Sequence, residues 1–198
     1  MYIYVKRVMD FCLSLLAIVF LSPIFLLIVI AMKLEEPKGS ILFVQKRVGR
    51  NKKLFSIYKF RSMKEDAPHD VPTEELESGV DMVTKVGHFL RKTSLDELPQ
   101  FFNVLKGDMS IVSPRPALWN QYYLIELRNQ VKGKYGLCAN DLRPGITGWA
   151  QINGRDNLSE EQKAQLDGEY VQQISFLMDC RCFFGTFLKV LRREGIKD

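Results

Sequence analysis

The chain has 198 residues, 46% of them hydrophobic, which is enough for one domain with a real core. Its 28 Lys and Arg exceed its 23 Asp and Glu, and the formal net charge of +5 fits anionic lipid, a phosphorylated ligand or nucleic acid without choosing among them. Two histidines, and four cysteines without paired C-x-x-C spacing, argue against a zinc site and indicate reduced thiols, typical of the cytoplasmic side.

The first predicted element is an apolar run at residues 11–32, which carries no charge and is long enough to cross a bilayer as a helix, since about 20 residues suffice. Ser22-Pro23 lies at its centre, where proline removes a backbone donor and predicts a break, and Ser22 can bond to a freed carbonyl. Basic residues flank both ends, and the positive-inside rule places both flanks in the cytoplasm: Lys6, Arg7, Lys33, Lys38, Lys46 and Arg47. We therefore expect residues 1–36 to form a re-entrant membrane helix broken at Ser22-Pro23, with a Pro-kinked single span as the alternative.

The elements after this run are predicted to be a β-hairpin and then mainly helices, an α+β fold that is mostly α. Residues 39–63 are rich in β-branched and aromatic residues around a turn at 49–52, and residues 64–80 form a polar loop. Helical patterning then runs in pieces from Val83 to Leu105. Beyond it we expect a helix at 117–132, a structured loop at 143–155, and a helical stretch from a capping box at 159–162 to Arg193, with a break near Ser175.

The last helical stretch carries phenylalanines interleaved with basic residues: Phe176, Phe183, Phe184 and Phe187 with Arg181 and Lys189. This pattern suits a helix that lies on a membrane surface. It suits ordinary packing against the protein equally well, so both interpretations stay open.

The sharpest chemical motif is Ser94-Leu95-Asp96-Glu97. A carboxylate can attack phosphorus to form an acyl phosphate, and a neighbouring carboxylate can hold Mg²⁺, which neutralises phosphate charge. The same four residues fit a helix capping box, in which Ser94 caps the helix and Asp96 lies near its N-terminus. The two interpretations are compatible, because helix N-termini also bind phosphate.

Basic residues supply further candidates for binding phosphate. Pro114-Arg115-Pro116 places one guanidinium, whose planar fork suits phosphate, between two stiffening prolines, although a surface turn has the same sequence. Residues 143–155 combine three glycines with Arg143, Arg155 and Trp149, which offers a stacking face; structural turns explain the glycines equally well. In the hairpin, basic side chains face either lipid head groups and phosphates or only solvent: Lys46, Arg47, Lys53, Lys59 and Arg61.

Taken together, these motifs resemble the bacterial sugar transferase family, the monotopic phosphoglycosyl transferases, in its minimal form. The resemblance covers nearly the whole chain in order, and the ordered set is far more specific than any one motif. The matching pieces are the apolar run with Ser22-Pro23 and residues 58–63, 93–100, 103–110, 114–116 and 143–155.

The resemblance implies a mostly helical body, residues 37–198, with a small β-hairpin and membrane-surface helices around an active site on the cytoplasmic face of the bacterial inner membrane. It implies that Asp96 attacks the β-phosphate of a UDP-sugar, releases UMP and holds the phosphosugar as an acyl phosphate. Undecaprenyl phosphate then attacks, giving a polyprenyl diphosphate sugar, a first membrane step of surface glycan assembly. Glu97 binds the Mg²⁺ cofactor on this model.

The phosphate- and nucleotide-binding roles come from the same resemblance. It implies that Arg115 holds phosphate with Lys59 or Arg61 nearby, and that Arg143 and the loop to Arg155 shape the nucleotide end. Family members often carry glycine where this chain has Ser113, and if that position needs a positive φ, serine strains the turn.

The partners implied are a UDP-sugar, undecaprenyl phosphate and membrane lipids, with a homodimer left open and no nucleic acid. A nucleic-acid-binding membrane protein is disfavoured because no helix-turn-helix, RNA-binding or zinc module is visible. A non-catalytic membrane scaffold for glycan assembly, and a transferase that moves sugar without its phosphate and releases UDP, remain alternatives. The sequence does not identify the sugar.

Overall fold

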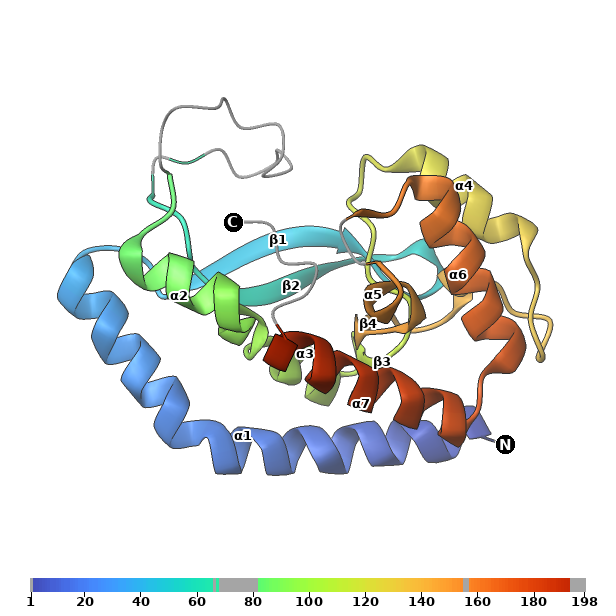
Figure 1. The fold of residues 1–198 in the computed structure, drawn as a ribbon, viewed down its shortest axis with the longest axis horizontal. Coiled ribbons are helices and arrows are strands. Elements are labelled where there is room, and N and C mark those ends of the chain that lie inside the picture. The colour runs from blue at the N-terminus through green and yellow to red at the C-terminus, as the bar shows by residue number, and fades with distance from the viewer. Residues whose placement is uncertain (1, 66, 68–81, 155–156, 193–198) are drawn as a thin grey trace.

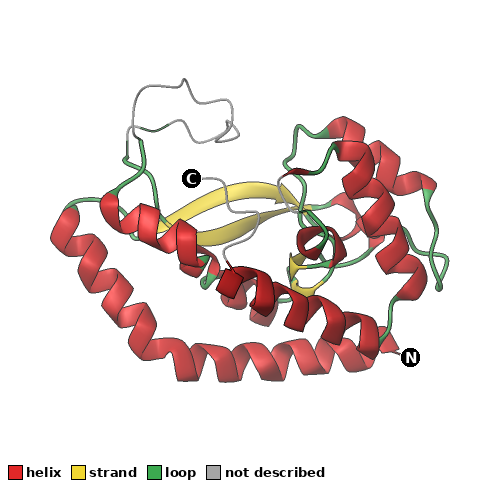
Figure 2. Ribbon diagram, viewed as in Figure 1, coloured by secondary structure: helices red, strands yellow, loops and turns green. Residues whose placement is uncertain are grey.

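The computed structural model describes residues 2–65, 67, 82–154 and 157–192, and in this part of the chain the fold is α+β and mostly helical (Figures 1 and 2). The helices are α1 (Tyr2–Glu35), α2 (Lys85–Thr93), α3 (Gln100–Lys106), α4 (Tyr122–Gln130), α5 (Trp149–Ile152), α6 (Glu160–Gln173) and α7 (Phe176–Arg192). The strands are β1 (Leu42–Val48), β2 (Leu54–Phe60), β3 (Ser110–Val112) and β4 (Gly145–Thr147). The capping box at Ser159 and the break between α6 and α7 near Ser175 are confirmed, whereas α4 begins at Tyr122, later than predicted.

Helix α1 continues through Pro23, so the predicted break is wrong in its strict form. Figure 1 shows instead that the helix bends, running along the lower edge of the molecule and then turning upward towards β1. Proline leaves the carbonyl of Val19 without its intrahelical donor, and the Ser22 hydroxyl donates to that carbonyl at 2.8 Å, as predicted. By length and composition, α1 is the one helix of the described residues that could cross a membrane.

The predicted hairpin is confirmed: β1 and β2 pair antiparallel, with Val48 opposite Leu54 across the turn. Asn51 and Lys52 take positive φ values of 54° and 60° in that turn. The structure also contains a second sheet that was not predicted, in which β3 pairs parallel with β4. The stretch 143–155, which was expected to be a loop, therefore holds a strand and the short helix α5.

This second sheet brings two segments into very close contact. A Cβ at Gly145 or Gly148 would lie 2.3 Å from backbone atoms of Ser113, so only glycine fits at these two positions. Ser113 itself is not among the described residues with a positive φ, and serine therefore causes no strain before Arg115.

The main hydrophobic core lies among α3, β3, α6 and α7, around fully buried residues such as Val104, Met109, Tyr170 and Cys182. A smaller core, in which Met32 and Phe60 are buried, packs the C-terminal part of α1 against β2 and α2. Helix α1 is thus packed on the body at the end that leads into the hairpin.

The other end of α1 is attached through buried polar groups, which we call the Asp179 cluster: Tyr2, Lys6, Tyr170 and Asp179. Lys6 donates to Asp179 Oδ2 at 2.5 Å, Tyr2 donates to the same oxygen, and Tyr170 donates to Oδ1 at 2.7 Å. One carboxylate therefore joins α1, α6 and α7.

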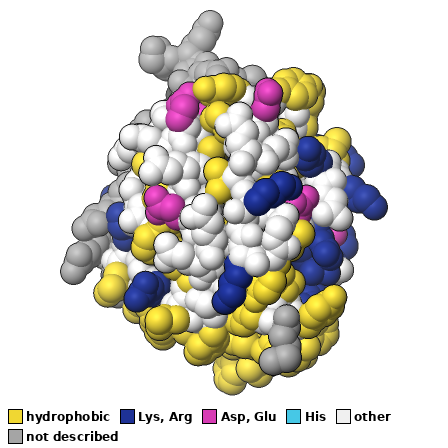
Figure 3. All heavy atoms as spheres, turned by 90° about the vertical axis from the view of Figure 1, so that its right-hand side faces the viewer, with side chains coloured by type: hydrophobic (Ala, Val, Ile, Leu, Met, Phe, Trp, Pro, Cys, Tyr) yellow, Lys and Arg dark blue, Asp and Glu magenta, His cyan; other side chains and the backbone are white. Residues whose placement is uncertain are grey.

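The exposed surface of α1 and α7 is apolar. The α7 residues Phe176, Phe183, Phe184 and Phe187 are between 51% and 62% exposed, so the protein itself leaves about half of each residue uncovered. Figure 3 shows hydrophobic side chains gathered along the lower edge of the molecule, where α1 and the start of α7 lie in Figure 1. We call this surface the apolar face. A contiguous apolar surface of this kind marks a membrane or partner contact.

Replacing Asp179 with Ala is expected to destabilise the protein strongly, by about 3–5 kcal/mol, because it leaves the buried Lys6 ammonium without its partner. Asp108→Ala is the control, since that carboxylate forms a more exposed ion pair with Lys106 at 3.4 Å and its loss costs about 1 kcal/mol or less. Thermal unfolding of both variants in one detergent tests this, and equal shifts would contradict it.

Candidate active site

The 94–97 motif lies in a tight link between two helices. Helix α2 ends at Ser94, which has left-handed φ and ψ of 56° and 19°, and a single 3₁₀ turn, Leu95–Glu97, leads on to α3. The Ser94 hydroxyl makes no capping bond, so the predicted capping box is wrong. A residue that caps a helix N-terminus has an extended conformation, which the left-handed Ser94 does not have.

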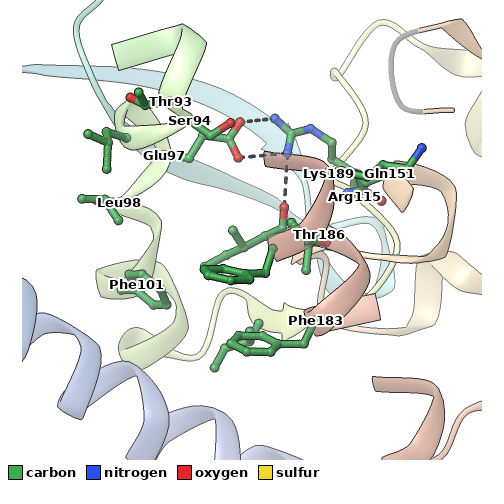
Figure 4. A pocket seen from close by; sticks show the side chains of 15 residues that line it. Thr93, Ser94, Glu97, Leu98, Phe101, Arg115, Gln151, Phe183, Thr186 and Lys189 are labelled. Atoms are coloured by element: carbon green, nitrogen blue, oxygen red, sulfur yellow. Dashed lines mark hydrogen bonds and ion pairs between the residues drawn. The ribbon is translucent and has the colours of Figure 1, made fainter. Parts of the chain in front are cut away.

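This turn presents Glu97 to two cations from distant segments. Lys59 of β2 donates to Glu97 Oε1 at 3.0 Å. Arg115, which follows β3, forms a two-pronged pair with the same carboxylate: Nη1 donates to Oε2 at 3.2 Å and Nη2 donates to Oε1 (Figure 4). Arg115 Nη1 also lies 3.2 Å from the carbonyl of Ile146 in β4, which fixes the guanidinium against the second sheet.

Asp96 lies beside this group and shares its lysine. Its residue is 8% exposed, and Oδ2 is 3.8 Å from Lys59 Nζ. The structure therefore brings together four of the predicted site residues, Lys59, Asp96, Glu97 and Arg115, from β2, the 3₁₀ turn and the segment after β3. We call Asp96 and Glu97 the carboxylate pair.

The two carboxylates differ in their affinity for protons. Burial raises the pKa of Asp96; the charge of Lys59 opposes this shift and the charge of Glu97 adds to it. Burial also acts to raise the pKa of Glu97, but Arg115 and Lys59 outweigh it and hold the pKa of that carboxyl well below its usual range. Glu97 is thus held in its charged form at neutral pH, and Asp96 is the more basic of the two. Neighbouring groups with separated pKa values suit different roles in one reaction.

A cavity of about 320 Å³ opens beside Glu97 and Arg115 (Figure 4). Its apolar wall includes Leu98 and Phe101 from one side and Phe183 and Phe187 of α7 from the other, and Asp96 lies outside this wall. Thr147, Gln151, Thr186 and Lys189 add polar groups to it. An apolar cavity with a few converging polar groups is the usual form of a small-molecule site.

Some of these polar groups had no assigned role in the sequence. The Ser94 hydroxyl and both amide atoms of Gln151 are buried and, within the described residues, have no hydrogen-bond partner. Burying such groups unpaired costs free energy, so they are placed to bind a ligand. Gln151 lies in the glycine-rich stretch that was predicted to form a binding loop. That prediction was the signal in the sequence that could have identified Gln151.

Other predicted site residues lie elsewhere. Arg61 pairs with Glu36 and donates to the carbonyls of Ser40 and Met63, at 2.7 and 2.9 Å, so it links the end of α1 to the hairpin. Arg143 donates to the carbonyl of Gly107 at 2.8 Å and lines a separate cavity. The structure does not bring either of them to the carboxylate pair. Arg155 lies outside the described residues.

A magnesium ion would find few protein ligands here. Across the described residues no three His, Cys, Asp or Glu side chains group as a metal site. Mg²⁺ usually takes only one or two carboxylates together with water and substrate phosphates, and the adjacent Asp96 and Glu97 fit that donor set. Glu97 already pairs with Lys59 and Arg115, so a metal ion bound there would compete with these two cations.

The family model described as "Bacterial sugar transferase" matches residues 1–193. The chain belongs to the bacterial sugar transferase family. Within this family it is 42% identical, over 191 residues, to the UDP-glucose:undecaprenyl-phosphate glucose-1-phosphate transferase of Escherichia coli; the match covers 93% of this chain and 39% of that protein.

Two further relatives differ in length. The chain is 36% identical to the UDP-N-acetylgalactosamine-undecaprenyl-phosphate N-acetylgalactosaminephosphotransferase of Aeromonas hydrophila, with 99% of this chain and 46% of that protein covered. It is 39% identical to the uncharacterized sugar transferase EpsL of Bacillus subtilis, with 97% and 90% covered. The chain thus spans less than half of the two transferases named for a sugar and most of the Bacillus protein.

Glu97→Gln is expected to lower stability at neutral pH by about 2 kcal/mol, because charge-assisted hydrogen bonds from Arg115 and Lys59 are weakened. A depressed folded-state pKa stabilises the protein above the ordinary pKa of 4.5, and this contribution is lost as the pH falls below that value. The difference in melting temperature between wild type and variant should therefore shrink below about pH 4.5. A difference that is constant with pH would contradict this account.

Proposed function

We propose that this chain transfers a phosphosugar from a UDP-sugar to undecaprenyl phosphate, releasing UMP, at the cytoplasmic face of the bacterial inner membrane. The observation that carries this proposal is the carboxylate pair, held by Lys59 and Arg115 at an apolar cavity whose far wall is α7. A water-soluble donor and a lipid acceptor must meet at such a boundary. Relatives named as undecaprenyl-phosphate sugar phosphotransferases support the same reaction.

In the first step, an Asp96 carboxylate oxygen attacks the β-phosphorus of the UDP-sugar. The bond from that phosphorus to the bridging oxygen breaks, and UMP leaves with the bridging oxygen and its electron pair. The phosphosugar stays on Asp96 as an acyl phosphate. The raised basicity of Asp96 favours this role, because a more basic carboxylate is the better nucleophile.

In the second step, a phosphate oxygen of undecaprenyl phosphate attacks the same phosphorus and displaces Asp96, which regains its carboxylate. Arg115 would hold the phosphates through its planar fork, with Lys59 neutralising a further charge. Glu97 would hold Mg²⁺, which when bound neutralises phosphate charge and stabilises the departing UMP. Arg115 lines the cavity whose other side includes Phe183 and Phe187, so these apolar side chains would limit the access of water to the phosphates that Arg115 holds.

The nucleophile is tested by incubating the protein with a UDP-sugar and Mg²⁺ without acceptor. Release of UMP and a protein adduct of sugar plus phosphate, mapped to the peptide with Asp96 and labile to hydroxylamine, is expected. Asp96→Asn should abolish both adduct and turnover, whereas Asp108→Asn should retain them. A scaffold would release no UMP, a transferase of sugar alone would release UDP, and UMP release only with acceptor would defeat the two-step mechanism.

Removing divalent metal with EDTA is expected to abolish turnover, and added Mg²⁺ should restore it, because the anionic carboxylates repel the phosphates unless a divalent cation lies between them. Glu97→Gln should lower turnover by about 100-fold or more even with excess Mg²⁺. Turnover is measured as UMP release across a panel of UDP-sugars with undecaprenyl phosphate, which also identifies the sugar. Full activity of the wild type in metal-free buffer would remove the metal from the mechanism.

The membrane arrangement is proposed to be re-entrant, since α1 bends and its flanks are basic. Cysteines placed at the exposed Tyr4 and Lys38, after Cys12 is replaced by Ser, should both be protected from a membrane-impermeant label in intact cells. Pro23→Ala should straighten the helix and favour a span, which exposes one label site outside. Labelling of one site in the unaltered helix would refute the re-entrant arrangement.

A further inference from the structure

A second cavity, of about 350 Å³, lies apart from the carboxylate pair and shares no lining residue with the first. Its wall includes Arg7 near the start of α1, Arg50 in the hairpin turn and Arg143 just before β4. Tyr4 and Tyr135 add aromatic edges. We call it the arginine pocket. Its three arginines come from segments far apart in the sequence, so the fold itself gathers this charge.

These arginines have no carboxylate partner among the described residues. In the parts of the chain that the structure describes, Arg61, Arg115 and Arg128 each form an ion pair, whereas Arg7, Arg50 and Arg143 form none. The pocket wall does contain two carboxylates, and both are engaged elsewhere. Asp10 accepts hydrogen bonds from the Ser110 hydroxyl at 2.6 Å and the Ile111 amide at 3.2 Å, and Lys6 lies 3.9 Å away. Asp141 accepts a hydrogen bond from the Cys138 amide at 2.9 Å, and Lys132 lies 3.8 Å away.

Capping of a helix C-terminus explains the positions of only some of these three arginines. Arg7 donates to the carbonyls of Val104 and Leu105 at 2.6 and 3.1 Å, and Arg143 donates through Nε to that of Gly107 at 2.8 Å, all at the C-terminal end of α3. Cations are favourable there because of the helix dipole. The described structure gives the Arg50 side chain no such carbonyl, although it lines the same pocket.

The result is a group of like charges with unused donors. Burial lowers the pKa of Arg143, and the charges of Arg50 and Arg7 lower it further, yet an arginine stays protonated at neutral pH. Arg143 engages only Nε, which leaves both terminal nitrogens of its guanidinium to bind a ligand. An anion with several acceptor oxygens relieves the repulsion and takes these donors, and a phosphate group matches the guanidinium fork.

We propose that the arginine pocket binds the phosphate group of an anionic phospholipid that is not a substrate. The apolar run begins at Phe11, one helical turn after Arg7, so the pocket lies where α1 enters its apolar stretch. Tyr4 and Val8, 81% and 64% exposed, flank it. Figure 3, which views the N-terminal side, shows Lys and Arg side chains above the apolar face. Basic side chains next to an apolar surface suit the anionic head groups of a membrane.

The test uses the full-length protein in detergent, with lipid retention measured by native mass spectrometry. Wild type is expected to retain phosphatidylglycerol and not phosphatidylcholine, whose choline charge offsets its phosphate. Arg50→Gln and Arg143→Gln should weaken retention by about tenfold or more. Lys53→Gln removes the same charge from the same exposed hairpin turn, outside the pocket wall, and should leave retention unchanged. Circular dichroism confirms that each variant is folded, and Arg50, exposed in its turn, is the variant least dependent on packing.

A second arm titrates inorganic phosphate and follows the melting temperature of the same four proteins. Phosphate-dependent stabilisation that needs Arg50 and Arg143, without lipid retention, would keep the phosphate site but assign it to a soluble ligand and overturn the lipid. Equal losses of lipid retention in Arg50→Gln and Lys53→Gln would show general charge attraction and overturn the proposed binding in the arginine pocket. Binding in neither arm would overturn the proposal altogether, and UMP release by the wild type is unaffected by either result.

Discussion

The arrangement of this protein depends on the hydrogen bonds that the buried Asp179 carboxylate accepts. At the start of α1, Tyr2 and Ile3 pack against the edge of the main hydrophobic core, and Lys6 and Tyr2 add the hydrogen bonds to Asp179 that fix this end of the helix. Such a buried group tolerates one arrangement only, because leaving either charge unpaired is costly. Asp179 lies on α7, whose Phe183 and Phe187 form part of the wall of the cavity beside Glu97. The position of α1 therefore also determines the shape of that cavity.

The carboxylate pair shows how one short turn separates two chemically similar groups. Glu97 faces two cations and is held as an anion. Asp96, its neighbour in sequence, forms an ion pair with the shared lysine at 3.8 Å, and burial raises its pKa. The left-handed Ser94 makes this possible, since it directs the chain into a 3₁₀ turn that presents successive side chains differently. Arg115, fixed by the carbonyl of Ile146, connects the pair to the second sheet.

Local features of the fold could be predicted from the sequence, and features that depend on distant contacts could not. The hairpin, the Ser159 capping box and the bond from Ser22 to Val19 each follow from a few adjacent residues. The parallel pairing of β3 with β4 joins segments whose closeness rests on Gly145 and Gly148 fitting against Ser113, and no local pattern signals it. Lys59 and Arg61 were equivalent candidates in the sequence, but β2 ends at Phe60, so Arg61 leaves the strand and binds Glu36 instead.

The Asp179 cluster also has a consequence for the biogenesis of the protein. Lys6 and Asp179 are 173 positions apart, so a ribosome makes α1 long before it makes the helix that carries its partner. Until α7 is made, the Lys6 ammonium lacks Asp179 and has to stay hydrated. The part of the cavity wall that contains Phe183 and Phe187 also belongs to α7, so it is made equally late. A nascent chain therefore lacks the complete cavity beside the carboxylate pair until translation has passed α7.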